Sequence, residues 1–193
     1  VMDFESAYVK ARKVQFYLPK EYEENPSKHF PVLYMQDGQN LFDPQTAYKG
    51  RAWELDKSSR NAIKNNEISP CIIVGISNVD TRFFDYFPQK ATVYLTKDDY
   101  VLMEQGGLEQ ASDTSNYLAD NYLKFLVNEL KPFIDKNYRT KTEAASTAIG
   151  GSSSGALISL YAICEYPQIF GQAACISTHW PVLFDNEFIS PSE

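Results

Sequence analysis

The feature that most constrains this chain is a run of small residues between two apolar segments. Residues 149–159 read IGGSSSGALIS. Thr147–Ile149 is typical of the end of a buried strand, and Ala156–Cys164 is small and apolar all round, as in a helix packed on a sheet. A flexible Gly/Ser linker would join polar or disordered segments. These residues therefore predict a sharp turn from strand to helix rather than a linker.

The turn matches the pattern G-x-S-x-G, with Ser153 at its centre. Such a turn is so tight that its flanking positions must be small, and its central serine has strained backbone and an exposed hydroxyl. The N–H groups at the start of the following helix point at that hydroxyl, where negative charge would develop. A short pattern also arises by chance in ordinary strand-to-helix turns. Its position between strand and helix favours Ser153, rather than Ser152 or Ser154, as a nucleophile.

The rest of the chain alternates strand and helix signals. Strands are predicted at Tyr8–Leu18, Phe30–Met35, Cys71–Ile76 and Gln172–Ile176. Helices are predicted at Trp53–Ile63, over Leu118–Ile134 with a kink or last turn at Pro132, and over Ala156–Cys164. Residues 81–116 predict loop with short elements. The alternation predicts a mostly parallel sheet with helices on both faces, a three-layer α/β sandwich.

Composition excludes several classes of protein. The length of 193 residues suits one domain, and a hydrophobic content of 44% is too high for a disordered chain. The net charge is −7 and no run of Lys or Arg forms a basic stripe, which argues against a nucleic-acid partner. No apolar run approaches the roughly 18 residues that span a bilayer, so no membrane segment is predicted.

The three cysteines indicate neither a disulfide framework nor a zinc site. Cys71, Cys164 and Cys175 are widely spaced and each lies in an apolar segment. The sequence predicts that they are small buried hydrophobic residues. Three cysteines without a disulfide pattern slightly favour a reducing compartment. The chain begins at Val1 rather than Met, which is compatible with a removed leader, so the compartment stays open.

Taken together, these segments resemble the esterase branch of the α/β-hydrolases. That branch includes S-formylglutathione hydrolases (esterase D), siderophore esterases, feruloyl and acetylxylan esterases, and mycolyltransferases. The resemblance is carried, in the family's order, by VQFYLP (14–19), VLYMQDGQNLFD (32–43), AWELD (52–56), IIVGISN (72–78), LKPFIDKNYRT (130–140), AIGGSSSGALISLYA (148–162) and YPQIFGQAACIS (166–177). The G-x-S-x-G turn is its specific motif. Ser154 is a departure, since relatives often carry Met there, but that position contributes mainly its backbone N–H.

The resemblance implies an oxyanion hole made of two backbone N–H groups. One belongs to Ser154, the residue after the nucleophile, and the other to Gln39 in the Asp-Gly-Gln stretch that follows the VLYM strand. Without the Ser153 motif, that stretch would be interpreted as an ordinary Asp-Gly turn. Trp53 is a candidate for lining the substrate pocket, with packing on the core as the alternative. No metal or organic cofactor is implied.

The catalytic acid and base are harder to assign. In the family the order is Ser, then Asp or Glu, then His. After Ser153 the sole histidine is His179, and Glu165, the one acid between them, falls near the end of a predicted helix. His29 is upstream in a polar stretch and is predicted to lie on the surface. The resemblance therefore implies that residues 1–193 are the N-terminal portion of a single α/β-hydrolase domain, incomplete at its C-terminal end, with the acid and base beyond Glu193.

On this interpretation His179 and Trp180 contact substrate, with packing of the loop as the alternative for both and the general base as a further alternative role for His179. Three functional hypotheses follow: a serine carboxylesterase acting on a small-molecule or sugar ester through an acyl-enzyme, an acyltransferase on the same scaffold, and a non-catalytic module that lacks the triad Asp and His. The sequence indicates neither the identity of the ester nor the oligomeric state.

Overall fold

The chain folds around one six-stranded sheet. In the computed structural model, the described residues are 1–180, 182–184 and 187–189. The strand order is β1-β2-β4-β3-β5-β6, with β1 and β2 antiparallel to their neighbours and β4, β3, β5 and β6 parallel to one another. The strands are β1 (Met2–Phe4), β2 (Arg12–Tyr17), β3 (Val32–Gln36), β4 (Ile72–Ile76), β5 (Thr147–Ser153) and β6 (Gln172–Thr178). The predicted mostly parallel sheet is thus confirmed.

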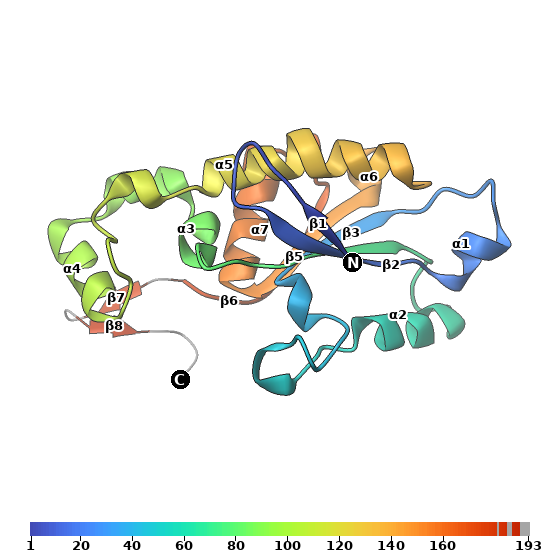
Figure 1. Cartoon of the computed structure of the whole chain (residues 1–193), viewed down its shortest axis with the longest axis horizontal. Helices are drawn as coiled ribbons and strands as arrows, with labels where there is room; N and C mark the ends of the chain where they lie inside the picture. Colours follow the sequence, from blue (N-terminus) through green and yellow to red (C-terminus); the bar gives the residue numbers. More distant parts are fainter. Residues whose placement is uncertain (181, 185–186, 190–193) are drawn as a thin grey trace.

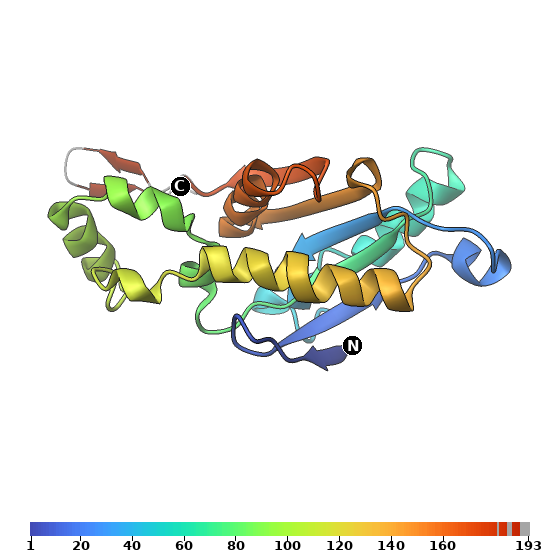
Figure 2. The same cartoon turned by 90° about the horizontal axis from the view of Figure 1, so that it is seen from above.

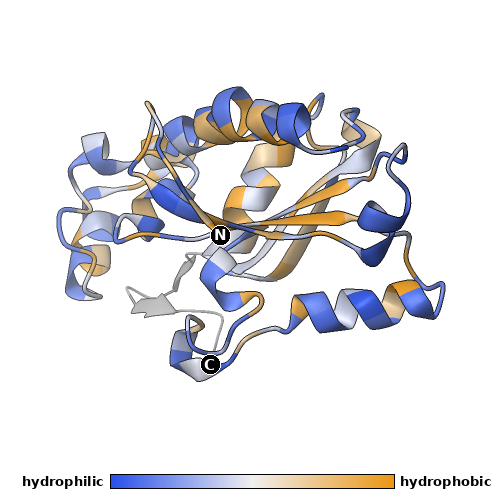
Figure 3. Cartoon of the chain, turned by 45° about the vertical axis from the view of Figure 1, so that its right-hand side comes forward, coloured by the Kyte–Doolittle hydropathy of each residue, from blue (hydrophilic) through white to orange (hydrophobic). Residues whose placement is uncertain are grey.

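Helices cover both faces of this sheet (Figure 1). One face carries α5 (Ala119–Lys124), α6 (Lys131–Asn137) and α7 (Ser154–Glu165), and the other carries α2 (Leu55–Lys64). Helices cover both faces of β4, so every residue of this strand is buried and its side chains are apolar on both faces. Figure 3 shows hydrophobic residues concentrated along the strands, whereas α2 is largely hydrophilic. The three-layer arrangement follows from this burial.

The helix that crosses one face of the sheet is continuous from α5 to α6 (Figure 2). Between them, Phe125–Leu130 forms a π-helical stretch just before Pro132. A proline lacks the N–H of a normal helical turn and its ring clashes with the carbonyl four residues earlier, so a local change in winding is expected there. The predicted disturbance at Pro132 is therefore present as a π segment, and the helix continues to Asn137.

A separate lobe lies beside the carboxyl ends of the strands. It contains α3 (Arg82–Tyr86), α4 (Lys97–Gln105), and 3-10 turns at Gln89–Tyr94 and Thr114–Asn116. A small core of Phe87, Met103, Ala111 and Tyr117 holds it together. The hairpin of β7 (Val182–Phe184) and β8 (Glu187–Ile189) lies near α4. The remaining short elements are α1 (Lys20–Glu24) and 3-10 turns at Gly38–Asn40, Tyr48–Gly50 and Ala144–Ser146.

Two predictions about local structure are wrong. The strand predicted at Tyr8–Leu18 begins only at Arg12, as β2, because the backbone N–H groups of Tyr8 and Val9 donate to the Ser6 hydroxyl and form a turn. Cys164 and Cys175 are exposed rather than buried, since β6 is the last strand of the described sheet. Cys71 is half-buried.

Candidate active site

Ser153 stands at the carboxyl end of β5, where the strand turns into α7. Its backbone has φ 57° and ψ −126°, a region that side-chain-bearing residues rarely adopt. The residue is exposed, and α7 begins at Ser154, the next residue. The predicted strained turn is confirmed. The first N–H groups of α7 have no partner within the helix, so they are available to a group bound beside Ser153.

Two glycines make this turn possible by close packing. A Cβ on Gly151 would lie 2.7 Å from the backbone carbonyl of Gly155 and 2.9 Å from Cβ of Gln36. A Cβ on Gly155 would lie 3.0 Å from the same Gln36 atom. Gln36 is the last residue of β3, the strand next to β5. The turn therefore fits against the end of the neighbouring strand with no room for larger residues.

A second unusual turn follows β3 at the same edge of the sheet. Asp37 has φ 56° and ψ 47°, in the left-handed region. Gly38 comes so close to β4 that an added Cβ would lie 2.5 Å from the backbone carbon of Gly75. Because β3 and β5 are parallel neighbours, this turn and Ser153 lie side by side. We call residues 37–39 the oxyanion loop, after the role predicted for Gln39.

Polar contacts from the residues after β4 hold this loop. Arg82 donates two hydrogen bonds to the Asp37 carboxylate, Nε to Oδ1 at 2.8 Å and Nη2 to Oδ2 at 2.7 Å. The Asn78 amide donates to Asp37 Oδ1 at 2.6 Å, and the Asn78 backbone N–H donates to the side chain of Gln39 at 3.1 Å. The pKa of Arg82 is lowered by burial, but the hydrogen bonds and charge of Asp37 outweigh this and raise the pKa overall.

Ser153 lies on the border of two clefts. One, of about 510 Å³, is lined mainly by polar residues, and we call it the polar cleft; its walls are Asp37, Gln39, Asn40, Tyr48, Trp53, Asn78, Arg82, Ser152 and Ser153. The other, of about 470 Å³, we call the apolar cleft; its walls are Phe83, Met103, Gly106, Gly107, Leu108, Ser153, Ser154 and His179. An ester positioned at Ser153 therefore has room for one part beside mainly polar residues and for the other part beside Phe83, Met103 and Leu108.

The structure brings most of the predicted site residues together. Ser153, Gln39 and Trp53 share the polar cleft, and Ser153, Ser154 and His179 share the apolar one. Trp180 is 49% exposed and does not belong to the described walls of either cleft.

The histidines and Glu165 occupy different settings. His179 is half-buried, and burial, together with the charge of Arg82, lowers its pKa below the ordinary value of 6.5. His29 is exposed, as predicted. Glu165, at the end of α7, pairs with Lys90. No three potential metal ligands gather in the described part of the chain.

Sequence reasoning missed the roles of Arg82, Asp37 and Asn78. Asp37 was visible as part of an Asp-Gly turn, but its two partners lie 41 and 45 residues away along the chain. Arg82 lies in the stretch 81–116 that predicts loop with short elements, and in the structure it is the first residue of the five-residue helix α3. No local signal in the sequence pairs Arg82 with the oxyanion loop.

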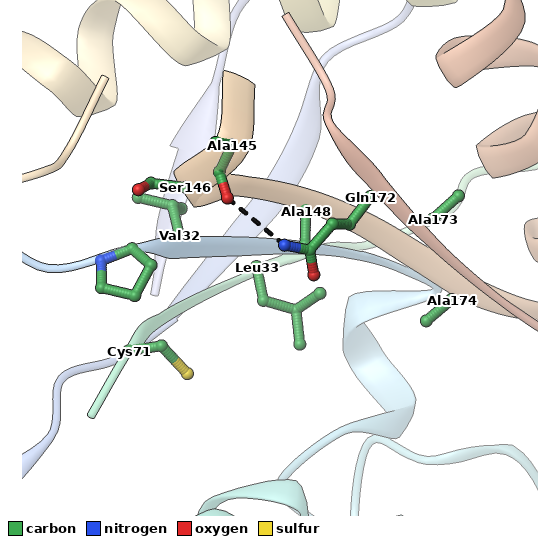
Figure 4. Close-up of a pocket in the computed structure, with 10 residues that line it drawn as sticks. Val32, Leu33, Cys71, Ala145, Ser146, Ala148, Gln172, Ala173 and Ala174 are labelled. Atoms are coloured by element: carbon green, nitrogen blue, oxygen red, sulfur yellow. Dashed lines mark hydrogen bonds between the residues drawn. The ribbon is translucent and has the colours of Figure 1, made fainter. Parts of the chain in front are cut away.

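A further hollow lies at the opposite end of the strands (Figure 4). It has a volume of about 330 Å³ and is lined mainly by small and apolar residues near the starts of β3, β5 and β6. Its one side-chain hydrogen bond in Figure 4 runs from Gln172 to the carbonyl of Ala145. Ligands of open parallel sheets bind at the carboxyl ends of the strands, so the two clefts at Ser153, and not this hollow, form the candidate active site.

The comparison with known families decides the relationship of this chain. The model of the family described as "Putative esterase" matches residues 6–189. The chain belongs to this esterase family. Its fold is accordingly that of the α/β-hydrolases, as the resemblance implied.

Individual relatives match most of this chain. Protein YbbA of Bacillus subtilis (strain 168) is 29% identical over 170 residues, which cover 88% of this chain and 58% of YbbA. The endo-1,4-beta-xylanase/feruloyl esterase of Xylanibacter ruminicola is 25% identical over 174 residues, covering 87% of this chain and 20% of that protein. The chain therefore spans less than two thirds of the length of either relative.

Solved structures show the same fold. The IroE-like serine hydrolase from Shewanella oneidensis superposes with a TM-score of 0.69 at 23% identity, covering 92% of this chain and 50% of that one. A ferulic acid esterase superposes with a TM-score of 0.63 at 20% identity, covering 92% of this chain and 58% of that one. Among the described residues, no helix is long and apolar enough to cross a membrane.

Proposed function

We propose that this chain is a serine esterase that cleaves carboxylic esters through an acyl-enzyme on Ser153, within a single α/β-hydrolase domain. The observation that supports this most directly is the exposed Ser153, in strained backbone, on the border of both clefts. A hydroxyl in this place reaches the carbonyl carbon of an ester that lies across the two clefts. Its fixed position reduces the entropy cost of bringing the two groups together.

The proposed reaction has two steps. The Oγ of Ser153 bonds to the ester carbonyl carbon while its proton passes to a base; the C–O bond to the alcohol then breaks, and the alcohol leaves with a proton. Water next attacks the acyl-enzyme, which releases the acid and restores the serine hydroxyl. In both steps the carbonyl oxygen becomes negatively charged and needs hydrogen-bond donors.

We assign those donors to the backbone N–H groups of Ser154 and Gln39. Ser154 is the first residue of α7, whose N-terminus favours negative charge. The Gln39 carbonyl accepts from Thr46 and its side chain accepts from Asn78, whereas its N–H has no acceptor among the described residues. Loss of one such donor typically raises a barrier by roughly 3 kcal/mol.

The two clefts suggest how the ester lies. We place its acyl group in the apolar cleft, against Phe83 and Met103, and its alcohol in the polar cleft near Trp53. Two relatives are named ferulic acid esterase and feruloyl esterase, so an aromatic acyl group is the first choice. His179 borders the apolar cleft and is assigned to substrate contact.

Labelling with a fluorophosphonate, measured by intact mass, tests the proposal. We expect one adduct on the folded chain, absent from Ser153→Ala and present in Ser152→Ala, a matched variant of the neighbouring serine in the polar cleft. An adduct that persists in Ser153→Ala contradicts the role of Ser153 as nucleophile. No adduct on a chain shown to be folded contradicts the proposal that residues 1–193 alone activate Ser153. Loss of labelling in a folded His179→Ala variant would make His179 the base rather than a substrate contact.

A further inference from the structure

We infer that Arg82 is a positioning residue for the oxyanion loop: through Asp37 it holds the Gln39 N–H in its place beside Ser153. The inference rests on the proposed function where it concerns catalysis. Its geometric part concerns only how the loop is held, so it is measurable without turnover.

The contact between Arg82 and Asp37 has a fixed geometry. Two guanidinium nitrogens meet the two carboxylate oxygens at 2.8 and 2.7 Å, a bidentate arrangement that sets orientation as well as distance. The Asp37 side chain is 10% exposed and that of Arg82 is 32% exposed, so the pair is partly shielded from water. A pair of this kind restrains its residues more than a surface ion pair does.

The backbone of Asp37 needs such a restraint. Its left-handed conformation is costly for a residue with a side chain, and Asp is among the few types that tolerate it. The next residue, Gly38, packs directly on β4. An ideal Cβ on Gly155 would lie 3.1 Å from Asp37 Oδ2, so the Asp37 carboxylate also reaches the first turn of α7. Asp37 therefore links the oxyanion loop to the turn that carries Ser153.

Arg82 is itself firmly placed. It is the first residue of α3, and its guanidinium lies 5.1 Å from the centre of the buried Tyr86 ring. Asp85 of the same helix forms a buried ion pair with Arg12 of β2 at 3.1 Å, which fixes α3 to the sheet. Although Arg82 borders the polar cleft, its Nε and Nη2 donate to Asp37, which is why we assign it an indirect role.

Hydrogen–deuterium exchange of Asn40 and Leu41 tests the geometric part, because their N–H groups donate to the loop carbonyls of Asp37 at 2.9 Å and Gly38 at 3.1 Å. In Arg82→Ala we expect these amides to exchange roughly tenfold faster, because the hydrogen bonds to a charged group that restrain the loop are lost. The control is Lys131→Ala, which removes another ion pair, to Asp135 at 2.6 Å. Lys131 also donates to the carbonyl of Thr142, near the amino end of the strands, so this variant should leave loop exchange unchanged. Equal exchange in Arg82→Ala and the native chain would overturn the inference.

Ester turnover tests the catalytic part. We expect Arg82→Ala to lower kcat by roughly 10- to 100-fold with little change in KM, because a donor displaced by a fraction of an ångström weakens only the transition state. Arg82→Lys should recover part of kcat, since an ammonium replaces the charge without the bidentate geometry. A rise in KM with unchanged kcat would instead make Arg82 a direct substrate contact.

A double-mutant cycle separates action through Asp37 from independent action. If Arg82 acts through Asp37, Arg82→Ala combined with Asp37→Asn should lower kcat no further than either change alone. If the double variant instead shows the product of the two single effects on kcat, the inference is overturned. If the native chain shows no esterase activity, the proposed function fails, and the exchange experiment still decides whether Arg82 holds the loop.

Discussion

Two turns meet at the carboxyl end of the sheet, and each places a residue other than glycine at a positive φ. Asp37 after β3 has φ 56°, and Ser153 at the end of β5 has φ 57°. They are held in different ways. Asp37 is fixed by hydrogen bonds from Arg82 and Asn78, whereas the Ser153 side chain makes no hydrogen bond with any described residue. The Ser153 turn is fixed by glycine packing instead.

The difference matches what each turn would contribute. At the Ser153 turn, steric fit holds the backbone, so the side chain remains available for chemistry. At the Asp37 turn the side chain is occupied in holding the backbone, and the available group is a backbone N–H. Two ways of stabilising an unfavourable conformation thus leave different groups available, a side chain at one turn and a backbone N–H at the other.

The largest effect is expected from disturbing the steric fit. Gly151→Ala would bring its Cβ to 2.7 Å from the Gly155 backbone, so the strand, the helix or both must shift. We expect a loss of about 3 kcal/mol in the free energy of unfolding, measured by urea denaturation. Gly106→Ala is the control, since its Cβ would meet its nearest neighbours at 3.4 Å. Equal stability of the two variants would show that the Ser153 turn is not held by packing.

Placing glycine at the two strained positions should have smaller effects on stability, and the two effects should differ in sign. Asp37→Gly relieves the backbone but removes the ion pair, and should destabilise the chain by about 1–2 kcal/mol. Ser153→Gly relieves the backbone and loses no hydrogen bond, so it should stabilise by about 1 kcal/mol while abolishing labelling. Urea denaturation of both variants gives the two signs. Equal signs would mean that the turns are held in the same way.

The smallest effect is a pH dependence of stability at His179, which borders the apolar cleft together with Ser153. Burial and the Arg82 charge lower its pKa in the folded chain below 6.5. As the pH falls from 6.5 towards that lower pKa, the unfolded chain takes up the proton first, so the free energy of unfolding should fall. We expect His179→Gln to remove this part of the slope. In an NMR titration, Arg82→Met should move the His179 pKa upwards; an unchanged pKa would place Arg82 too far away to act.

Much of this organisation was predictable because its signals are local. The apolar runs of β4 and α7, and the G-x-S-x-G turn between strand and helix, each lie within a few consecutive residues. Side-chain period and residue size therefore predicted the parallel sheet and the unusual backbone at Ser153. The same local reasoning failed at Tyr8–Val9. The alternating pattern there predicts a strand, but the backbone N–H groups of both residues donate to the Ser6 hydroxyl and do not pair with the sheet.

By itself, then, the sequence determined the alternation of the main strands and helices, the strained turn at Ser153 and the resemblance to the esterase family. Only the tertiary structure decided that Arg82 meets Asp37 across 45 residues and that Ser153 borders one polar and one apolar cleft. The physical reason is that turn geometry depends on neighbouring residues, whereas an ion pair or a cleft depends on which strand ends the sheet brings together.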